Sequence, residues 1–90
     1  MSACSRTLEI TNKRGLHARA SAKFVNAASA LSAKVEVEKD GNRVVGTSIM
    51  GLMMLGAAMG DTITIHCDGE GCDQALDELV ALVEGRFGEE

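Results

Sequence analysis

Residues 61–83, DTITIHCDGEGCDQALDELVALV, contain two different spacings of apolar side chains. Apolar and polar positions alternate over the first seven residues, which is typical of a β-strand with one buried face. His66 falls in the polar phase of this strand and is interpreted as an ordinary exposed residue. From residue 72 onward the apolar positions recur every three or four residues, which predicts an amphipathic helix over 72–83. Asp73 favours the start of that helix, and Gly85 is a suitable residue for its end.

Three other stretches alternate in the same way and are predicted to be half-buried strands over 6–11, 34–39 and 43–46. The second and third are separated by Asp40-Gly41-Asn42, a composition that favours a tight hairpin. Each of the four strands therefore has one apolar face. Together they predict a sheet that is covered on one side only.

Two further helices are expected between the strands. The first is predicted over 18–31, where the apolar residues follow helical spacing. The second is a short helix within 47–56, because Thr47 and Ser48 are good N-cap residues and two glycines limit its length. The resulting order is strand, helix, strand, strand, short helix, strand, helix. This order predicts an α+β two-layer sandwich built from two split strand-helix-strand halves.

The chain has 90 residues and no linker-like composition, which indicates a single domain spanning residues 1–90. Hydrophobic residues make up 46% of it, but the aromatic side chains are limited to Phe24 and Phe87. The core must therefore be built mainly from aliphatic side chains and methionine. At this length, roughly 60% of the unfolded surface can be buried.

The charge balance excludes some classes of partner. With 9 basic and 13 acidic residues, the net charge is -4, so nothing would drive general binding to nucleic acid or to a membrane surface. The N-terminal residues lack the apolar run of a signal peptide, and no stretch is long and apolar enough to insert into a membrane. A cytoplasmic protein is expected, and any anion site must be local.

The cysteines Cys4, Cys67 and Cys72 are odd in number and lack the paired spacing of a zinc or redox motif. They are interpreted as reduced thiols, and burial explains both Cys67 and Cys72. No metal site and no cofactor are therefore expected.

Residues 15–25, GLHARASAKFV, place His17 where the helix over 18–31 begins. The unpaired N–H groups of a first helical turn bind anions, and the helix dipole disfavours a protonated imidazole there. A neutral imidazole is a nucleophile, and a phosphoryl group on it would find positive charge on Arg19 and Arg14. This pattern describes a phosphohistidine site. The alternative is that His17 merely caps a helix or lies on the surface.

The stretch at 15–25 and the later stretch GTSIMGLMMLGA at 46–57 together resemble the HPr phosphocarrier proteins of the bacterial phosphotransferase system. The resemblance covers nearly the whole chain. It implies an open-faced sandwich of four antiparallel strands covered on one face by three helices, in the order βαββαβα. It also implies that Nδ1 of His17 accepts a phosphoryl group from phosphorylated enzyme I and passes it to EIIA-type proteins.

The same resemblance assigns roles to other residues. Arg19 would neutralise the phosphoryl group, and Arg14 is a weaker match for the same role. Ser48 matches a regulatory serine, which implies an HPr kinase/phosphorylase as a partner. Docking residues flanking the histidine would be Ile49, Met50 and Met53. Some of these side chains are expected to face solvent in any case, because the short helix is too apolar to bury them all. A monomer is expected.

One residue departs from the family pattern. The family commonly has a proline directly after the arginine of the motif, and this chain has Ala20. Alanine is a good helix former, so the helix should persist. The residue that would pre-organise the first turn is absent, which puts in question how rigidly His17 and Arg19 are held.

The preferred interpretation is a phosphoryl relay that works only with partner proteins, rather than an enzyme acting alone on a small molecule. A second hypothesis is a regulatory protein that acts through Ser48 phosphorylation and partner binding. A third is a small acylphosphatase-like hydrolase, which shares the size and the α+β class. Against the hydrolase, His17 supplies a nucleophile that would retain the phosphate.

Overall fold

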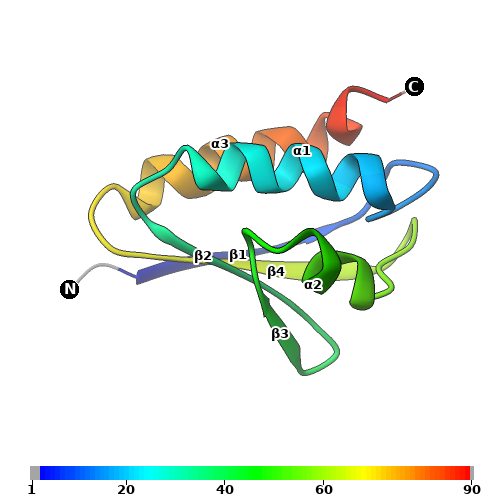
Figure 1. The fold of residues 1–90 in the computed structure, drawn as a ribbon, viewed down its shortest axis with the longest axis horizontal. Helices are drawn as coiled ribbons and strands as arrows, with labels where there is room; N and C mark the ends of the chain where they lie inside the picture. Colours follow the sequence, from blue (N-terminus) through cyan, green and yellow to red (C-terminus); the bar gives the residue numbers. More distant parts are fainter. Residues whose placement is uncertain (1–2, 90) are drawn as a thin grey trace.

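The computed structural model describes residues 3–89 and contains an open four-stranded sheet with helices packed on one face (Figure 1). The order βαββαβα is the predicted one, and it is followed by a short 3₁₀ turn, η1. The elements are β1 (Ala3–Glu9), α1 (Ala18–Ser29), β2 (Lys34–Lys39), β3 (Asn42–Val45), α2 (Ile49–Met54), β4 (Thr62–Asp68), α3 (Cys72–Glu84) and η1 (Arg86–Gly88).

The strands are arranged β1-β4-β2-β3, and every neighbouring pair is antiparallel. Figure 1 shows α1 and α3 side by side across the sheet, and the shorter α2 near β3. Leu52 of α2 is fully buried in the same core that α1 and α3 cover. The predicted α+β open-faced sandwich is therefore confirmed.

Two predicted elements differ from the structure by more than one residue at a boundary, and β3, β4 and the end of α3 differ by one. The first strand spans Ala3–Glu9 rather than 6–11, because its pairing with β4 begins at Ala3 opposite Asp68. The first helix ends at Ser29 rather than at residue 31. There the N–H groups of Ala30 and Leu31 donate to carbonyls three residues back, which tightens and ends the helix. The predicted bounds of β2 and the predicted start of α3 are correct.

The hairpin between β2 and β3 has a two-residue turn. Lys39 pairs with Asn42, and both Asp40 and Gly41 have positive φ, at 51° and 83°. This is the backbone that tight hairpins need, and residues such as Asp and Gly tolerate it.

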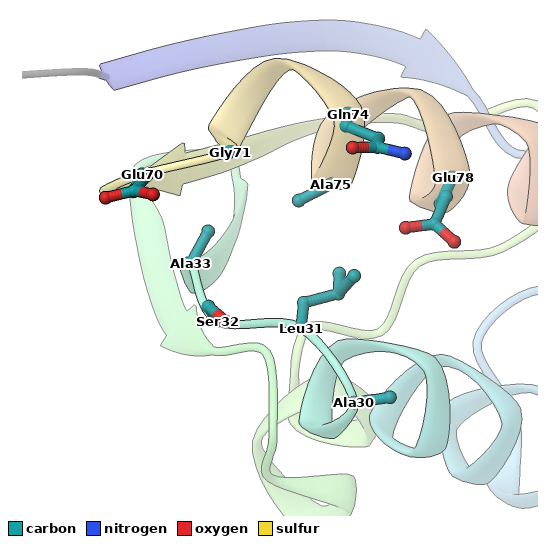
Figure 2. Close-up of a pocket in the computed structure, with 9 residues that line it drawn as sticks. All are labelled: Ala30, Leu31, Ser32, Ala33, Glu70, Gly71, Gln74, Ala75 and Glu78. Atoms are coloured by element: carbon teal, nitrogen blue, oxygen red, sulfur yellow. The ribbon is translucent and has the colours of Figure 1, made fainter.

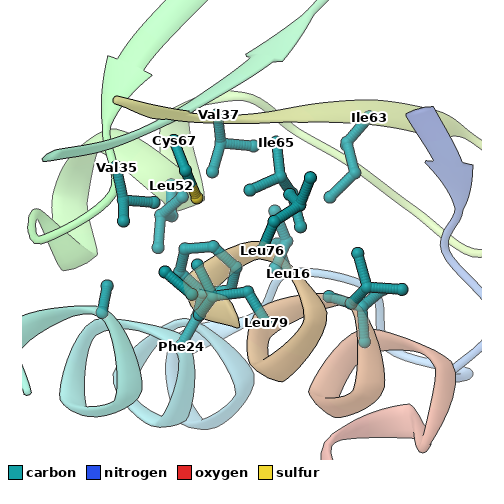
Figure 3. Packing of buried hydrophobic residues seen from close by; sticks show 14 of the residues in the cluster. Leu16, Phe24, Val35, Val37, Leu52, Ile63, Ile65, Cys67, Leu76 and Leu79 are labelled. Atoms are coloured by element: carbon teal, nitrogen blue, oxygen red, sulfur yellow. The ribbon is translucent and has the colours of Figure 1, made fainter. Parts of the chain in front are cut away.

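The core lies between the sheet and the helices, and it is mainly aliphatic (Figure 3). Val35 and Val37 of β2 and Ile63 and Ile65 of β4 point toward the helices, as their alternation predicts. Phe24 of α1 is 1% exposed and sits opposite them. Burying these side chains contributes roughly 1.5–3 kcal/mol each relative to exposure.

The opposite face of the sheet is polar. Thr7 and Thr64 hydrogen-bond to each other across β1 and β4. His66 also lies on this face, but it is less exposed than predicted, and its Nε2 is 2.8 Å from Oε1 of Glu38. The reason is that β4 is an inner strand, so neighbours on both sides cover the imidazole. Within residues 3–89, no helix has the length and apolar character needed to cross a membrane.

Candidate functional site

His17 occupies the N-cap position of α1, as the sequence predicts. Its backbone is extended, with φ −76° and ψ −178°, and its carbonyl accepts the hydrogen bond from the N–H of Ser21. The imidazole makes no capping hydrogen bond. The side chain is therefore available for other contacts next to the first turn of a helix.

Gly15 anchors the loop that precedes His17. It has φ +61°, and a Cβ at this position would lie 2.2 Å from the carbonyl oxygen of Ala57. The next residue, Leu16, donates its N–H to that oxygen over 2.9 Å. Only glycine permits this close backbone approach. The loop is thereby attached to the segment that follows α2.

The imidazole contacts the C-terminal segment of the chain. Nε2 of His17 is 2.6 Å from Oε2 of Glu89, and both side chains are about four-fifths buried, with 23% and 20% exposed. Asn12 braces the same carboxylate, because its Nδ2 donates to Oε1 of Glu89 at 3.2 Å and to the carbonyl of Gly15 at 2.8 Å. The carboxylate is therefore held from two sides.

Glu89 reaches this position through a turn after α3. Arg86 and Phe87 adopt positive φ, at 57° and 55°, and reverse the direction of the chain. Such backbone costs on the order of 1 kcal/mol per residue and persists where packing requires it. Here Phe87 is 1% exposed in the core, and Lys23 Nζ donates to its carbonyl over 2.6 Å. Burial of Phe87 thus sets the position of Glu89.

The hydrogen bond from His17 determines which ring nitrogen is free. It holds the pKa of Glu89 below its ordinary value, and Asn12 adds to this effect, so the group is a carboxylate near neutral pH. A carboxylate only accepts hydrogen bonds, which means that Nε2 carries the proton. Among residues 3–89, no group hydrogen-bonds to Nδ1. Nδ1 therefore presents its lone pair.

Three cationic side chains share a cavity with His17. A cavity of about 310 Å³ is lined by Lys13, Arg14, His17, Arg19 and Glu89. Lys13, Arg14 and Arg19 are exposed, and none of them takes part in an ion pair with another described residue. A multiply charged anion placed at Nδ1 would meet two guanidinium groups, one ammonium group and the start of α1. The structure thus brings together the three residues expected from the sequence, His17, Arg14 and Arg19.

A second feature is an exposed apolar surface over and around α2. We call it the Met patch; it consists of Val45, Ile49, Met50, Met53, Met54 and Met59, which are all exposed. Ile49, Met50 and Met53 were expected on this surface, whereas the others extend it. Ser48 stands at its edge as the N-cap of α2, and its Oγ accepts from the N–H of Gly51 over 3.0 Å. The predicted capping role of Ser48 is confirmed.

The model of the family described as "PTS HPr component phosphorylation site" matches residues 4–85. The chain belongs to the HPr family. It is 46% identical over 84 residues to the phosphocarrier protein HPr of Cupriavidus necator, covering 93% of this chain and 94% of that protein. It is 51% identical over 83 residues to an HPr of Neisseria meningitidis serogroup A, covering 92% and 93%.

A solved HPr structure from Thermoanaerobacter tengcongensis superposes with a TM-score of 0.92 at 45% identity, covering 97% of this chain and 98% of that one. An HPr structure from Bacillus anthracis superposes with a TM-score of 0.87 at 37% identity, covering 92% and 99%. The chain thus belongs to the HPr phosphocarrier family of the phosphotransferase system and has the fold expected from its sequence.

Ala20, which stands where proline is common in HPr proteins, is fully buried. The helix begins at Ala18, so the first turn forms without the proline. The methyl group of Ala20 belongs to the same buried core cluster as Leu16 and Phe24. Core packing therefore holds this turn from its inner side.

Sequence reasoning missed three residues of the site. Lys13 precedes Arg14 in a loop next to His17, so the cluster of positive charge in the sequence could have predicted its place in the site. Asn12 and Glu89 had no comparable signal. Their roles depend on burial at the base of the loop and on the turn after α3, and neither produces a local sequence pattern.

Another hollow lies at the other end of α1 (Figure 2). It has a volume of about 270 Å³ and lies between the segment after α1 and the start of α3. Its charged side chains, Glu70 and Glu78, are both acidic, and none of its lining residues is a cation, a histidine or a cysteine. It is therefore unsuited to a phosphoryl group. Of the three cavities described for residues 3–89, the one at His17 holds three Lys or Arg side chains, whereas the cavity beside His66 holds Arg43 alone, together with the acidic Asp68.

Proposed function

We propose that this HPr-family chain carries a phosphoryl group on Nδ1 of His17, accepting it from phosphorylated enzyme I and passing it to EIIA-type proteins. The observation that carries the proposal is the 2.6 Å contact between Nε2 of His17 and Glu89. It occupies Nε2 and leaves Nδ1 with its lone pair, and the cavity that His17 lines also holds three cationic side chains.

The acceptance step forms one bond and breaks one. The Nδ1 lone pair attacks phosphorus, while the bond between phosphorus and the donor protein breaks and its electron pair returns to the donor. The imidazole becomes a phosphorylated imidazolium that still holds its proton on Nε2. The carboxylate of Glu89 stabilises this positive charge, as a buried carboxylate does for a catalytic histidine.

The cations contribute mainly while the phosphoryl group is in transit. Arg19 and Arg14 neutralise charge on its equatorial oxygens, and Lys13 adds a mobile ammonium group. These side chains are exposed in the free protein, so they adapt as a partner approaches. The reverse attack, by an acceptor nucleophile on the same phosphorus, releases neutral His17 and completes the relay.

The Met patch is the proposed docking surface for both donor and acceptor proteins. Methionine side chains are flexible and polarizable, which allows one surface to fit partners of different shape. The short helix α2 that carries most of the patch packs on α1, which His17 caps, so docking there brings a partner to the same side of the molecule. We propose that the monomer is the working species.

Regulation at Ser48 is a second proposed role, and its position favours it. A phosphate on Ser48 would add about two negative charges at the edge of the Met patch while remaining at a helix N-terminus that tolerates negative charge. A kinase/phosphorylase specific for HPr would be the partner for this step. The relay and this regulation use different atoms and are compatible with each other.

The test uses purified enzyme I, phosphoenolpyruvate and the full chain. We expect one acid-labile phosphate per chain, measured by intact mass. His17→Ala should abolish it, whereas His66→Ala is the matched control and should retain it. Adding an EIIA-type protein should remove the phosphate from the wild type and load the acceptor. Undiminished phosphorylation of His17→Ala would overturn the proposal, as would loss of the label in His66→Ala alone.

A further inference from the structure

Three metal-ligating side chains meet where β1 and α3 both begin. Cys4 is the second residue of β1, whereas Cys72 and Asp73 are the first two residues of α3. The two Sγ atoms and a carboxylate oxygen of Asp73 all lie within 4.8 Å of one another. No cysteine described in residues 3–89 forms a disulfide, so both thiols are available as ligands.

The sheet register explains this meeting. Cys4 lies directly opposite Cys67, which is buried on the face that the helices cover, so Cys4 points toward the same side. The first turn of α3 lies over this end of the sheet and places Cys72 against Cys4. Figure 1 shows that β1 and α3 begin at one end of the molecule, while α1 begins at the other. The cluster is therefore remote from His17.

We propose that Cys4, Cys72 and Asp73 form a binding site for a thiophilic divalent metal ion, with Zn²⁺ as the natural occupant. Two thiolates and one carboxylate are a ligand set that Zn²⁺ accepts, and ligand atoms within 4.8 Å of one another can converge on one ion after small rotations of the side chains. Cys4 is half-buried and Asp73 is exposed, so water reaches the fourth position.

Electrostatics supports the proposal independently of the ligand types. The hydrogen bond to Cys72 raises the pKa of Cys4 to about 12, and burial and the charges of Cys72 and Asp73 act in the same direction. The neighbouring groups therefore disfavour the anionic form of Cys4, and a divalent cation bound between them would relieve this repulsion. The N–H groups of the first turn of α3 also favour negative charge on its first residues.

Binding has a definite proton balance. A metal ion binds the deprotonated form of cysteine, so binding releases about two protons to solvent when both cysteines are thiols beforehand. The bound ion would connect the edge strand β1, which pairs with only one neighbour, to α3. The expected consequence is a more stable fold whose melting temperature depends on metal concentration. The proposal does not depend on phosphoryl transfer.

Cd²⁺ is a suitable probe, because cadmium–thiolate bonds give an ultraviolet charge-transfer band that histidine or carboxylate ligands do not. The reduced full-length protein is titrated with Cd²⁺ alone while absorbance and proton release are recorded. We expect the band to saturate at one equivalent, with about two protons released per ion. Zn²⁺ added afterwards should compete and remove the band.

Three variants locate the site. Cys4→Ser, at a half-buried position, should abolish the saturating band and the metal-dependent rise in melting temperature. Asp73→Asn should weaken binding on the order of tenfold. Asp77→Asn, another exposed acid one turn further along α3, is the matched control and should bind as the wild type does.

The proposal is overturned by any of three results: no thiolate band, a band that persists in Cys4→Ser, or equal weakening in the two aspartate variants. A folded Cys4→Ser protein, verified by its circular dichroism, makes the second result decisive. Metal bound at His17 or His66 gives no such band, so it cannot be mistaken for this site.

Discussion

Nε2 of His17 lies 2.6 Å from Oε2 of Glu89, although 72 residues separate the two in the chain. This contact assigns the proton to Nε2 and leaves Nδ1 with its lone pair, and His17 lines the cavity that also holds Lys13, Arg14 and Arg19. It also links the reacting side chain to the packing of the C-terminal turn. The first two predictions test this relationship.

Glu89→Gln should slow phosphorylation of His17 by enzyme I. The amide can still accept a hydrogen bond from Nε2, but it carries no charge to stabilise the imidazolium, so we expect a loss on the order of tenfold. The proton on Nε2 should also become less favoured, which ¹⁵N NMR of the ring nitrogens measures directly. Glu84→Gln, an exposed acid at the end of α3, is the control. Unchanged nitrogen shifts and rates in Glu89→Gln would contradict the proposed role.

Glu89 should also contribute to the pH dependence of stability. Its folded-state pKa is lowered from 4.5, first of all by the hydrogen bond from His17. The stabilisation is therefore fully present above pH 4.5 and is lost as the pH falls through the folded-state value. The free energy of unfolding, measured with urea across the acid range, should fall more steeply for the wild type than for Glu89→Gln. His17→Ala removes the hydrogen-bond donor, so it should weaken the pH dependence of the free energy of unfolding in the same way. Equal pH dependence in the wild type and both variants would refute this assignment.

Arg19→Ala should slow phosphoryl transfer in both directions while leaving the melting temperature nearly unchanged. The guanidinium is exposed and has no ion-pair partner among the described residues, so the resting fold gains little from it. Its charge matters when the phosphoryl group arrives, and we expect a loss on the order of tenfold. Arg43→Ala, on the polar face of the sheet, is the control. Wild-type rates in Arg19→Ala would remove this residue from the site.

Gly15→Ala should destabilise the protein more than Gly56→Ala does. Both glycines have positive φ, at 61° and 65°, so a side chain is strained at each. A Cβ at Gly56 meets no atom within 4 Å, whereas a Cβ at Gly15 would lie 2.2 Å from the carbonyl oxygen of Ala57. We expect about 1 kcal/mol for Gly56→Ala from strain, and about 1–3 kcal/mol more for Gly15→Ala from the clash. Urea unfolding of the two variants measures the difference, and equal losses would show that the close approach is unimportant.

Ser48→Asp should weaken docking without removing the helix cap. Aspartate is a good N-cap residue, so α2 should persist, but its charge lies beside the Met patch. We expect a raised Michaelis constant for the chain as substrate of enzyme I, a small change in maximal rate, and a difference that shrinks at high salt. Ser48→Ala separates the two effects, because it loses about 1 kcal/mol of capping without adding charge. Equal kinetics for Ser48→Asp and the wild type at every salt concentration would leave Ser48 as a cap only.

Local patterns in the sequence were sufficient for the order of the elements. Apolar and polar residues alternate in β2 and β4, and apolar residues recur at helical spacing in α3. In each of these elements the apolar positions form the buried face, so the pattern of burial can be read from a few neighbouring residues. The cap at Ser48 and the hairpin turn at Asp40–Gly41 are also local, because a side chain or a glycine satisfies the backbone there. His17 and Arg19 are two residues apart at a helix start, so their proximity was visible as well.

Tertiary structure decided the contacts between residues far apart in the chain. Glu89 reaches His17 because Phe87 is buried and forces a turn with positive φ, and no short-range pattern encodes that turn. Cys4 and Cys72 meet because the register of β1 against β4 places one beneath the first turn of α3. The sequence by itself determined the strands, the helices and the nucleophile, since hydrophobic spacing and capping act locally. The partners of that nucleophile and the thiol cluster depend on how the core closes, because their positions follow from the packing of side chains that the chain brings together only on folding.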